Sequence, residues 1–261
     1  MYSSYASTAQ KHDIKKYFNR LLRKLMPWEE PPLRDKTAST APSKPVMLVI
    51  HERFNDIHAM YRCYAPSIRG LSKYFTLYAM VEEQYIDDAG RAIFEDVTII
   101  PKIKNMTDIA AKVVSLAPDM IYYPSLGMSH WTVMLAQLRL APIQLMTHGH
   151  PATSMCDHID YTYVCEMEGD LSLVNSETVI VGPDTADLDP HVHLPSPLPA
   201  LATATDRQVR VAVNSKVMKL SSRLIGICQR LERNSAVPVV FSFFPGERGL
   251  FFDGLEAAIK S

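Results

Sequence analysis

The sequence of 261 residues has no apolar run of about 18 residues, so no segment of it is expected to span a membrane. Its first residues, MYSSYASTAQKHD, lack the apolar core of a signal peptide. Neither sign of charge is in excess, with 27 Lys and Arg against 28 Asp and Glu, which argues against a nucleic-acid binder. The four cysteines have no CxxC spacing and predict neither a zinc site nor a disulfide framework. These absences predict a cytoplasmic protein.

Several catalytic motifs are also missing. The sequence contains no Walker A motif, no GxSxG, no HExxH and no paired zinc half-sites. What is present is an ordinary globular composition, 47% apolar and 21% charged, in a chain long enough for one large domain or two modest ones. Function must therefore be inferred from local patterns.

Residues 1–45 differ from the rest of the chain in composition and in hydrophobic pattern. Residues 11–26, KHDIKKYFNRLLRKLM, predict a basic amphipathic helix, and residues 27–45 contain five of the 18 prolines and predict an extended linker. We expect the apolar stripe of this helix to dock on the protein itself and to leave the basic side in solvent. The alternative is peripheral contact with a membrane surface or a partner through residues 11–26. The stripe comprises Ile14, Phe18, Leu21, Leu22 and Leu25.

From Val46 onward short apolar strands alternate with helical patterns, which predicts an α/β fold with a mostly parallel sheet. We expect a complete Rossmann-like lobe over residues 46–181, a proline-rich linker over 182–207, and the incomplete start of a second lobe over 208–261. The expected strands of the first lobe are 46–50, 75–80, 97–100, 119–123 and 142–146, and its helices 57–71, 106–117 and 129–139. Those of the second lobe are strands 209–213 and 237–244 with a helix over 219–234.

The loop after the first strand carries the first candidate site, because ligands bind at the carboxyl ends of parallel strands. His51 and His58 flank this loop, and a histidine there can act as a general base. The alternative is a histidine that caps a helix or packs in the core. Tyr61 and Arg62 follow on the same helix, where Arg62 could hold a phosphate or carboxylate or simply form a surface ion pair.

Two further strand ends carry polar turns. In YYPSLGMSHW (122–131) the backbone amides around Gly127 could meet an anion, or the segment is an ordinary turn with Ser129 as the helix cap. In LMTHGHPATS (145–154) an HxH pair ends at His150 but lacks a carboxylate or cysteine pair at ligand spacing. A turn lining a site is favoured over a metal site there, and the carboxylates and histidines of residues 182–193 are interpreted as part of the linker.

The segment NSKVMKLSSR (214–223) places lysines at a strand-to-helix junction. A lysine beside free helix amides suits a diphosphate, and the alternative is an exposed lysine in a first helical turn.

Several segments together resemble glycosyltransferase family forty-one, which includes the O-linked N-acetylglucosamine transferases and the bacterial adhesin-modifying protein N-glucosyltransferases. The central segment is RLAPIQLMTHGHPATSMCDHIDYTYV (139–164). YPSLGMSHW and HERFNDIHAMYR are closer to the bacterial branch, and VNSKVMKLS and FSFFPGERGLFFDG resemble the opening of the family's second lobe.

This resemblance implies a GT-B architecture of two Rossmann-like lobes. It implies inverting transfer of a hexose, usually glucose, from a UDP-sugar to a protein side chain, usually Asn in an adhesin sequon, without a metal or cofactor. His58 matches the family's active-site histidine and Lys219 the lysine that contacts the donor diphosphate. Ser215 and Lys216 fall near other donor contacts, and Tyr61, Arg62 and His150 are expected to line the acceptor side.

The sequence departs from the family in two respects. Family members continue well past Ser261, and their N-terminal helical domain is here reduced to one basic helix and a linker. We therefore expect a fragment with impaired activity. The alternatives are a non-catalytic module that binds protein or nucleotide, and an unrelated α/β sugar or nucleotide binder.

Overall fold

The computed structural model describes residues 10–26, 44–103, 105–165, 175–183 and 208–245, together with the single residues 6, 8, 32 and 257. The chain forms two compact units, which consist mainly of His12–Leu194 and Pro195–Ser261 and are called here the first and second unit. Each unit is described by itself. Most of the expected linker over 182–207 and the PGERG turn at 245–249 lie outside the described residues.

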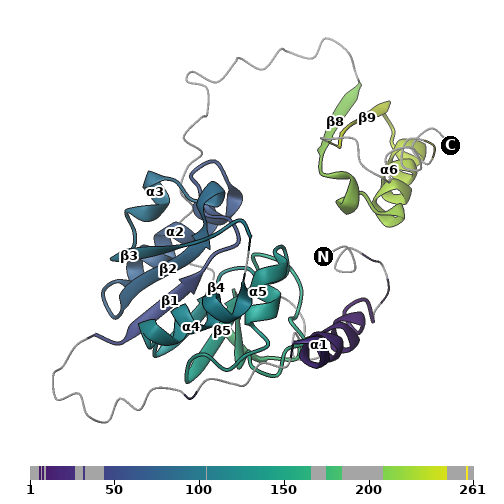
Figure 1. Ribbon diagram of the computed structural model, residues 1–261. Helices are drawn as coiled ribbons and strands as arrows, with labels where there is room; N and C mark the ends of the chain where they lie inside the picture. The colour runs from purple at the N-terminus through teal and green to yellow at the C-terminus, as the bar shows by residue number, and fades with distance from the viewer. Residues whose placement is uncertain are drawn as a thin grey trace. The chain divides into compact units, whose positions relative to one another are not determined.

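A seven-stranded parallel sheet forms the first unit (Figure 1), in the order β3-β2-β1-β4-β5-β6-β7. The winding direction reverses between β1 and β4, and a cleft at such a switch point is where ligands of doubly wound folds bind. The strands are β1 (Val46–Ile50), β2 (Thr76–Glu82), β3 (Asp96–Ile100), β4 (Met120–Tyr123), β5 (Ile143–Thr147), β6 (Tyr161–Cys165) and β7 (Thr178–Gly182).

Helices cover both faces of this sheet, because alternate residues of the buried strands point to opposite sides. On one face Leu48 and Ile50 of β1 pack with residues of α4 and α5, and on the other Met47 and Val49 pack with residues of α2. This doubly wound arrangement confirms the predicted Rossmann-like lobe. The helical elements are α2 (Ala59–Leu71), the 3-10 turn η2 (Glu83–Tyr85), α3 (Asp88–Arg91), α4 (Met106–Leu116) and α5 (His130–Leu135).

All five strands predicted for this lobe are present, but the sequence patterns did not predict β6 or β7. The two strands extend the sheet beyond β5, and β7 is its last strand. Buried residues alternate with exposed or half-buried ones along β6, and three of the five residues of β7 are exposed. β6 therefore lacks the apolar run that marks β1, and β7 carries only the shorter run VIV.

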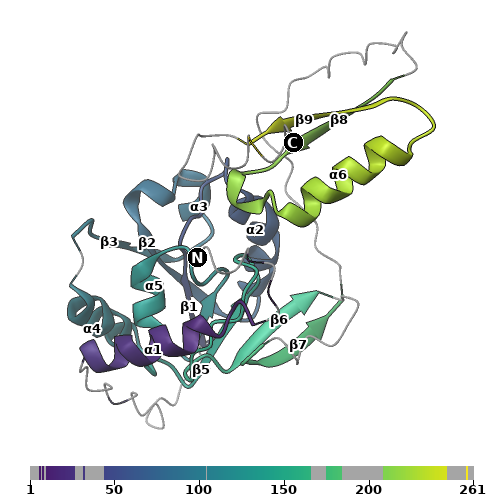
Figure 2. The same ribbon diagram turned by 90° about the vertical axis from the view of Figure 1, so that its right-hand side faces the viewer.

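Helix α1 (Ile14–Leu25) lies against the connection between β5 and β6 (Figure 2). Lys15 Nζ donates to the carbonyl of Thr153 at 2.7 Å, and Asn19 Nδ2 donates to the carbonyls of Ser154 at 3.1 Å and Met155 at 2.6 Å. This connection, residues 148–160, contains no helix of its own. A helix that lies more than 120 residues earlier in the sequence thus covers a connection between parallel strands that would ordinarily contain its own helix.

The orientation of α1 contradicts the expectation that its apolar stripe docks on the protein. Its polar side faces the first unit, because the segment it covers offers backbone carbonyls and the Asp157 carboxylate, and these need donors. Arg23 completes the contact with an ion pair to Asp157. Four of the five residues of the expected stripe are exposed, as is Tyr17, and only Leu22 is half-buried. The exposed large apolar side chains are those of Ile14, Tyr17, Phe18, Leu21 and Leu25.

The described residues of the second unit, 208–245, form one βαβ element, as predicted. Strands β8 (Val209–Asn214) and β9 (Val239–Phe244) pair in parallel, and the 3-10 turn η4 (Val217–Lys219) precedes α6 (Ser222–Asn234). One face of the two strands packs against this helix. Leu220 and Ile225 form that small core with Val213, Val217, Leu224 and Phe243.

Candidate active site

The carboxyl edge of the sheet at the β1–β4 switch point is organised around Glu52, which lies two residues after the end of β1 and is 1% exposed. Its Oε1 accepts hydrogen bonds from the amides of Gly127 at 3.0 Å, Met128 at 2.9 Å and Ser129 at 2.8 Å. Two hydroxyl groups complete the set. Ser125 Oγ donates to Oε2 at 2.8 Å and Thr132 Oγ1 donates to Oε1 at 2.6 Å.

The sequence had suggested that the amides of the turn after β4 could bind an anionic ligand. In the structure these amides instead bind the Glu52 side chain of the protein itself. Burial raises the pKa of the Glu52 carboxyl, and the hydrogen bonds from Thr132, Ser129, Ser125 and Gly127 act in the opposite direction. The Ser129 side chain makes no cap bond, so Glu52 takes over the role of the helix cap for α5. The carboxylate joins β1 to the start of α5 across the switch point.

The loops after β4 and β5 touch at this edge. The Gly149 amide donates to the carbonyl of Pro124 at 3.0 Å, and Thr147 Oγ1 donates to the same carbonyl at 2.8 Å. A Cβ on Gly149 would lie only 2.5 Å from the Met60 side chain of α2, so glycine is required for this close approach. The start of α2 and the loops after β4 and β5 therefore converge at one place.

His51 and His58 have different environments. His51 is buried, stacks on the Phe54 ring with centroids 3.9 Å apart, and neither ring nitrogen has a hydrogen-bond partner. Burial lowers the pKa of His51 to about 3, so this ring is neutral. His51 is therefore the core-packed histidine that the sequence analysis gave as the alternative to a general base. His58 is half-buried and caps α2, with Nδ1 accepting from the Met60 amide at 3.1 Å.

Tyr61 and Arg62 lie in the first turn of α2, next to His58. The Tyr61 ring packs on Phe54 with centroids 5.1 Å apart, and its hydroxyl accepts from Arg69 at 3.5 Å. Arg62 donates to the carbonyl of Ile57 at 3.2 Å, and thereby braces the loop that carries His58.

His150 lies in the loop after β5 and is 1% exposed. A Cβ on Gly127, whose φ is +128°, would lie 2.8 Å from the His150 ring, so the turn after β4 closes directly over it. Burial, with the charge of Lys15 as a smaller cause, lowers the pKa of His150 to about 4. The ring is thus neutral and lies beneath the turn that binds Glu52.

A second buried carboxylate, Glu177, holds the rest of the loop after β5. Thr153 Oγ1 donates to Glu177 Oε2 at 2.8 Å and the Ser154 amide donates to Oε1 at 2.7 Å, with a further bond from the Ser154 hydroxyl. Lys15 of α1 closes the same loop from outside. Burial lowers the pKa of Lys15 to about 8, while the charges of Glu177 and Glu52 act to raise it.

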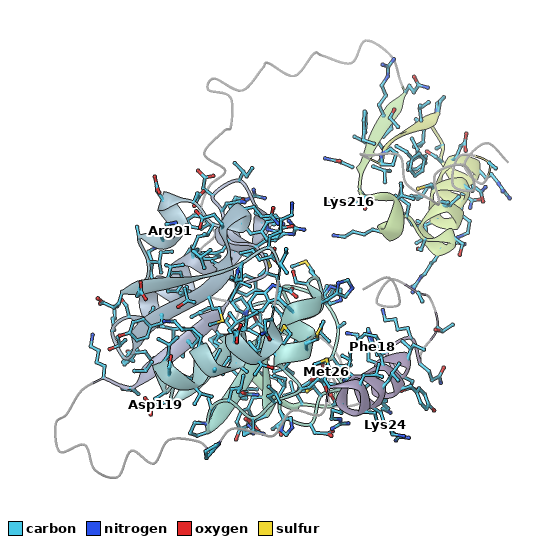
Figure 3. The ribbon with its side chains drawn as sticks, in the orientation of Figure 1. Phe18, Lys24, Met26, Arg91, Asp119 and Lys216 are labelled. Carbon is cyan, nitrogen blue, oxygen red and sulfur yellow. The ribbon has the colours of Figure 1, made fainter. Side chains whose placement is uncertain are left out.

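The donor-side candidates Ser215, Lys216 and Lys219 lie between β8 and α6 in the second unit. The η4 turn is closed by a bond from the Lys219 amide to the Lys216 carbonyl at 2.8 Å, and both lysines are exposed (Figure 3 labels Lys216). Ser221 caps α6 by accepting from the Leu224 amide at 3.3 Å. The structure thus gathers His58, Tyr61, Arg62 and His150 on one unit and places the other three on the other.

Within the described residues, no group of three or more His, Cys, Asp or Glu side chains is arranged to hold a metal ion. Among the same residues no helix is long and apolar enough to cross a membrane.

The sequence patterns missed Glu52, Glu177 and Lys15. The hydrogen bonds of Glu52 span 73 to 80 residues and those of Glu177 span 23 or 24, so no local spacing reports them. The one available signal was a carboxylate two residues after the end of a buried strand.

No family model matches the chain. The whole chain is 28% identical to each of two UDP-glucose:protein N-beta-glucosyltransferases of Actinobacillus pleuropneumoniae, from serotypes 5b and 7, and spans 43% of their length. A solved structure of a point variant of the O-GlcNAc transferase of Thermobaculum terrenum matches 98% of this chain and 49% of that one. The TM-score is 0.66 at 14% sequence identity, which shows a common fold. The predicted resemblance and the predicted GT-B type fold are thereby confirmed.

Proposed function

We propose that this chain acts in the transfer of a hexose, glucose by preference, from a UDP-sugar to a protein side chain. The observation that carries the proposal is the similarity of the whole chain to two enzymes whose names state that activity. The acceptor we propose is an Asn side chain in an adhesin sequon, and the reaction takes place in the cytoplasm without a metal or cofactor.

The proposed step forms a bond from the acceptor amide nitrogen to the anomeric carbon and breaks the bond from that carbon to the diphosphate oxygen. The diphosphate leaves with the electron pair and takes up the proton that the amide loses. Negative charge therefore grows on the diphosphate, and without a metal it must be met by cations and N–H or O–H donors. We assign this role to Lys219, with Ser215 and Lys216 as further donors.

We assign His58 to the acceptor side. Because its Nδ1 accepts from the Met60 amide, the neutral ring carries its proton on Nε2. His58 in this state donates a hydrogen bond and orients a substrate oxygen rather than removing a proton. Tyr61 and Arg62 hold the same loop and helix turn, and His150 supports the loop after β5 from within.

The second candidate function is a binding module without turnover. The observation in its favour is that Lys216 and Lys219 are exposed beside the one βαβ element that the described residues of the second unit form. Such a module would retain nucleotide or protein binding and transfer no sugar.

Isothermal titration of the full chain with UDP tests the donor site. We expect a Kd on the order of micromolar, and we expect Lys219→Ala to weaken binding roughly 10- to 100-fold, because a charge-assisted hydrogen bond contributes about 1.5 to 3 kcal/mol. The matched control is Lys112→Ala on the exposed surface of α4, which should bind UDP like the unmodified chain.

Turnover of UDP-glucose on a sequon peptide then separates the two candidate functions. Glucosylated peptide, identified by mass, supports the transferase. UDP binding that depends on Lys219 without any product supports the binding module. UDP binding that is absent, or equal in the two lysine variants, overturns the assignment of the donor site to Lys219. If the sequon peptide still binds while UDP does not, the result favours a protein-binding module.

A further inference from the structure

Helix α1 presents an outer surface that is both apolar and basic, and we propose that this surface binds an anionic membrane surface. The inference is independent of the proposed sugar transfer. It depends on how the helix is fixed to the first unit, on which side chains it leaves exposed, and on the charges that lie beside them.

The orientation of α1 is fixed by its polar side. Lys15, Asn19 and Arg23 are spaced four residues apart, so they lie on one line along the helix, and all three bond to the segment 153–157. Asn19 is 2% exposed and bonds to two backbone carbonyls. Rotation of the helix to bury its apolar side would leave those carbonyls without donors and is therefore disfavoured.

The apolar side of α1 remains in contact with solvent. Leu21 is 50% and Leu25 68% exposed, and Tyr17 is 66% exposed. These residues recur every three or four positions and form one continuous stripe along the helix. The stripe consists of Ile14, Tyr17, Phe18, Leu21 and Leu25.

Basic residues run along the same outer surface. Lys16, Arg20 and Lys24 are all exposed, are spaced four apart, and lie beside the apolar stripe (Figure 3 labels Phe18 and Lys24). No acidic residue lies within Ile14–Leu25, and the one described carboxylate in an ion pair with this row is Asp13, 3.2 Å from Lys16 at the start of the helix. A surface that covers this helix must therefore offer apolar groups and negative charge together.

An anionic lipid surface offers both, since acyl chains accept the apolar stripe and head groups pair with the lysines and arginine. A second copy of this chain is a poor occupant, because a two-fold contact through α1 would bring the same cations face to face. The helix of 12 residues is about 18 Å long, too short to span a bilayer. It would lie in the plane of the interface while its polar side holds the first unit.

Vesicle flotation with the full chain tests the proposal. We expect binding to vesicles of phosphatidylcholine with phosphatidylglycerol, and little binding to phosphatidylcholine alone. Arg20→Gln with Lys24→Gln should lower the partition coefficient roughly 30-fold, because each basic residue near an anionic surface contributes about a factor of five. The matched control, Lys73→Gln with Lys112→Gln, removes two exposed cations away from α1 and should bind normally.

The apolar contribution is tested separately. Phe18→Gln with Leu21→Gln should reduce binding to background, whereas Ile103→Gln, which alters a 91% exposed side chain away from α1, should not. Circular dichroism of each variant confirms that it is folded. The proposal is overturned if the unmodified chain does not bind anionic vesicles, if the control pair weakens binding as much as the α1 pair, or if the chain forms a dimer that Phe18→Gln with Leu21→Gln dissociates.

Discussion

The two units use the same local pattern, a strand followed by a polar loop and a helix, with opposite results. After β1 the loop buries Glu52 and His51, and the first unit encloses both in its core. After β8 the loop leaves Lys216 and Lys219 exposed, and β8 and β9 are covered by α6 on one face. Packing thus fixes the polar groups of the first unit, while those of the second are available to a ligand. Substitution of Glu52 or His51 in the first unit should therefore chiefly change stability, whereas substitution of Lys216 or Lys219 in the second should chiefly change binding.

The largest expected effect is that of Glu52→Ala, which removes the acceptor shared by three amides and two hydroxyls. We expect the first unit to lose about 3 to 5 kcal/mol of unfolding free energy, because buried donors would be left without a partner. Urea denaturation followed by Trp131 fluorescence, in a Trp28→Phe background, measures this loss. The control Glu95→Ala, at an exposed position, should stay within about 0.5 kcal/mol. If Glu52→Ala and Glu95→Ala lowered the unfolding free energy equally, the conclusion that packing around Glu52 stabilises the first unit would be wrong.

A smaller effect for each residue is expected from acidification. His51 and His150 have pKa values lowered to about 3 and about 4 in the folded state, from 6.5. The unfolded chain therefore takes up protons first, so their contribution is present above pH 6.5 and is lost as the pH falls towards the folded values. By pH 5 each histidine should cost about 2 kcal/mol.

His51→Phe should remove about half of this pH dependence, measured as unfolding free energy between pH 7 and pH 5. The described residues of the second unit contain no histidine, so its unfolding transition provides the internal comparison. A second-unit transition with the same pH dependence as the first would contradict the assignment to His51 and His150.

The smallest expected effects come from removing one helix N-cap in each unit, which compares the stability of the two units directly. Asn105 caps α4 by accepting from the Thr107 amide at 3.1 Å, and Ser221 caps α6 by accepting from the Leu224 amide at 3.3 Å. Replacement of either by Ala should cost about 1 kcal/mol. Each change should shift the thermal transition of its own unit alone in calorimetry. A single transition shifted by both would show that the units unfold together.

The sequence predicted much of the first unit because its central strands are buried on both faces. VMLVI of β1 is an unbroken apolar run and is buried from Met47 to Ile50. Its sequence therefore predicted both that it forms a strand and that the strand lies in the core. The strand β6 alternates between buried and more accessible residues, and β7, at the sheet edge, carries only the three-residue apolar run VIV, most of it exposed.

The candidate site was predicted less completely, because its chemistry depends on contacts between distant segments. Gly127 and His150 were both singled out by their own motifs, but only the folded chain shows that one lies over the other. The orientation of α1 could not be predicted either. A helical stripe predicts amphipathicity, whereas the side that docks is decided by the carbonyls of Ser154 and Met155, more than 130 residues away.

That distance has a consequence for how the protein is made. Helix α1 is synthesised before the segment that it binds, so its three anchoring side chains have no partner until residues 153–157 have been made, 134 to 138 positions later. Until then the helix must persist as a loose amphipathic segment, which an isolated 12-residue helix does only marginally. Its capture is therefore a late event in biogenesis, and translation that stops short of that segment would yield a nascent chain with α1 unattached.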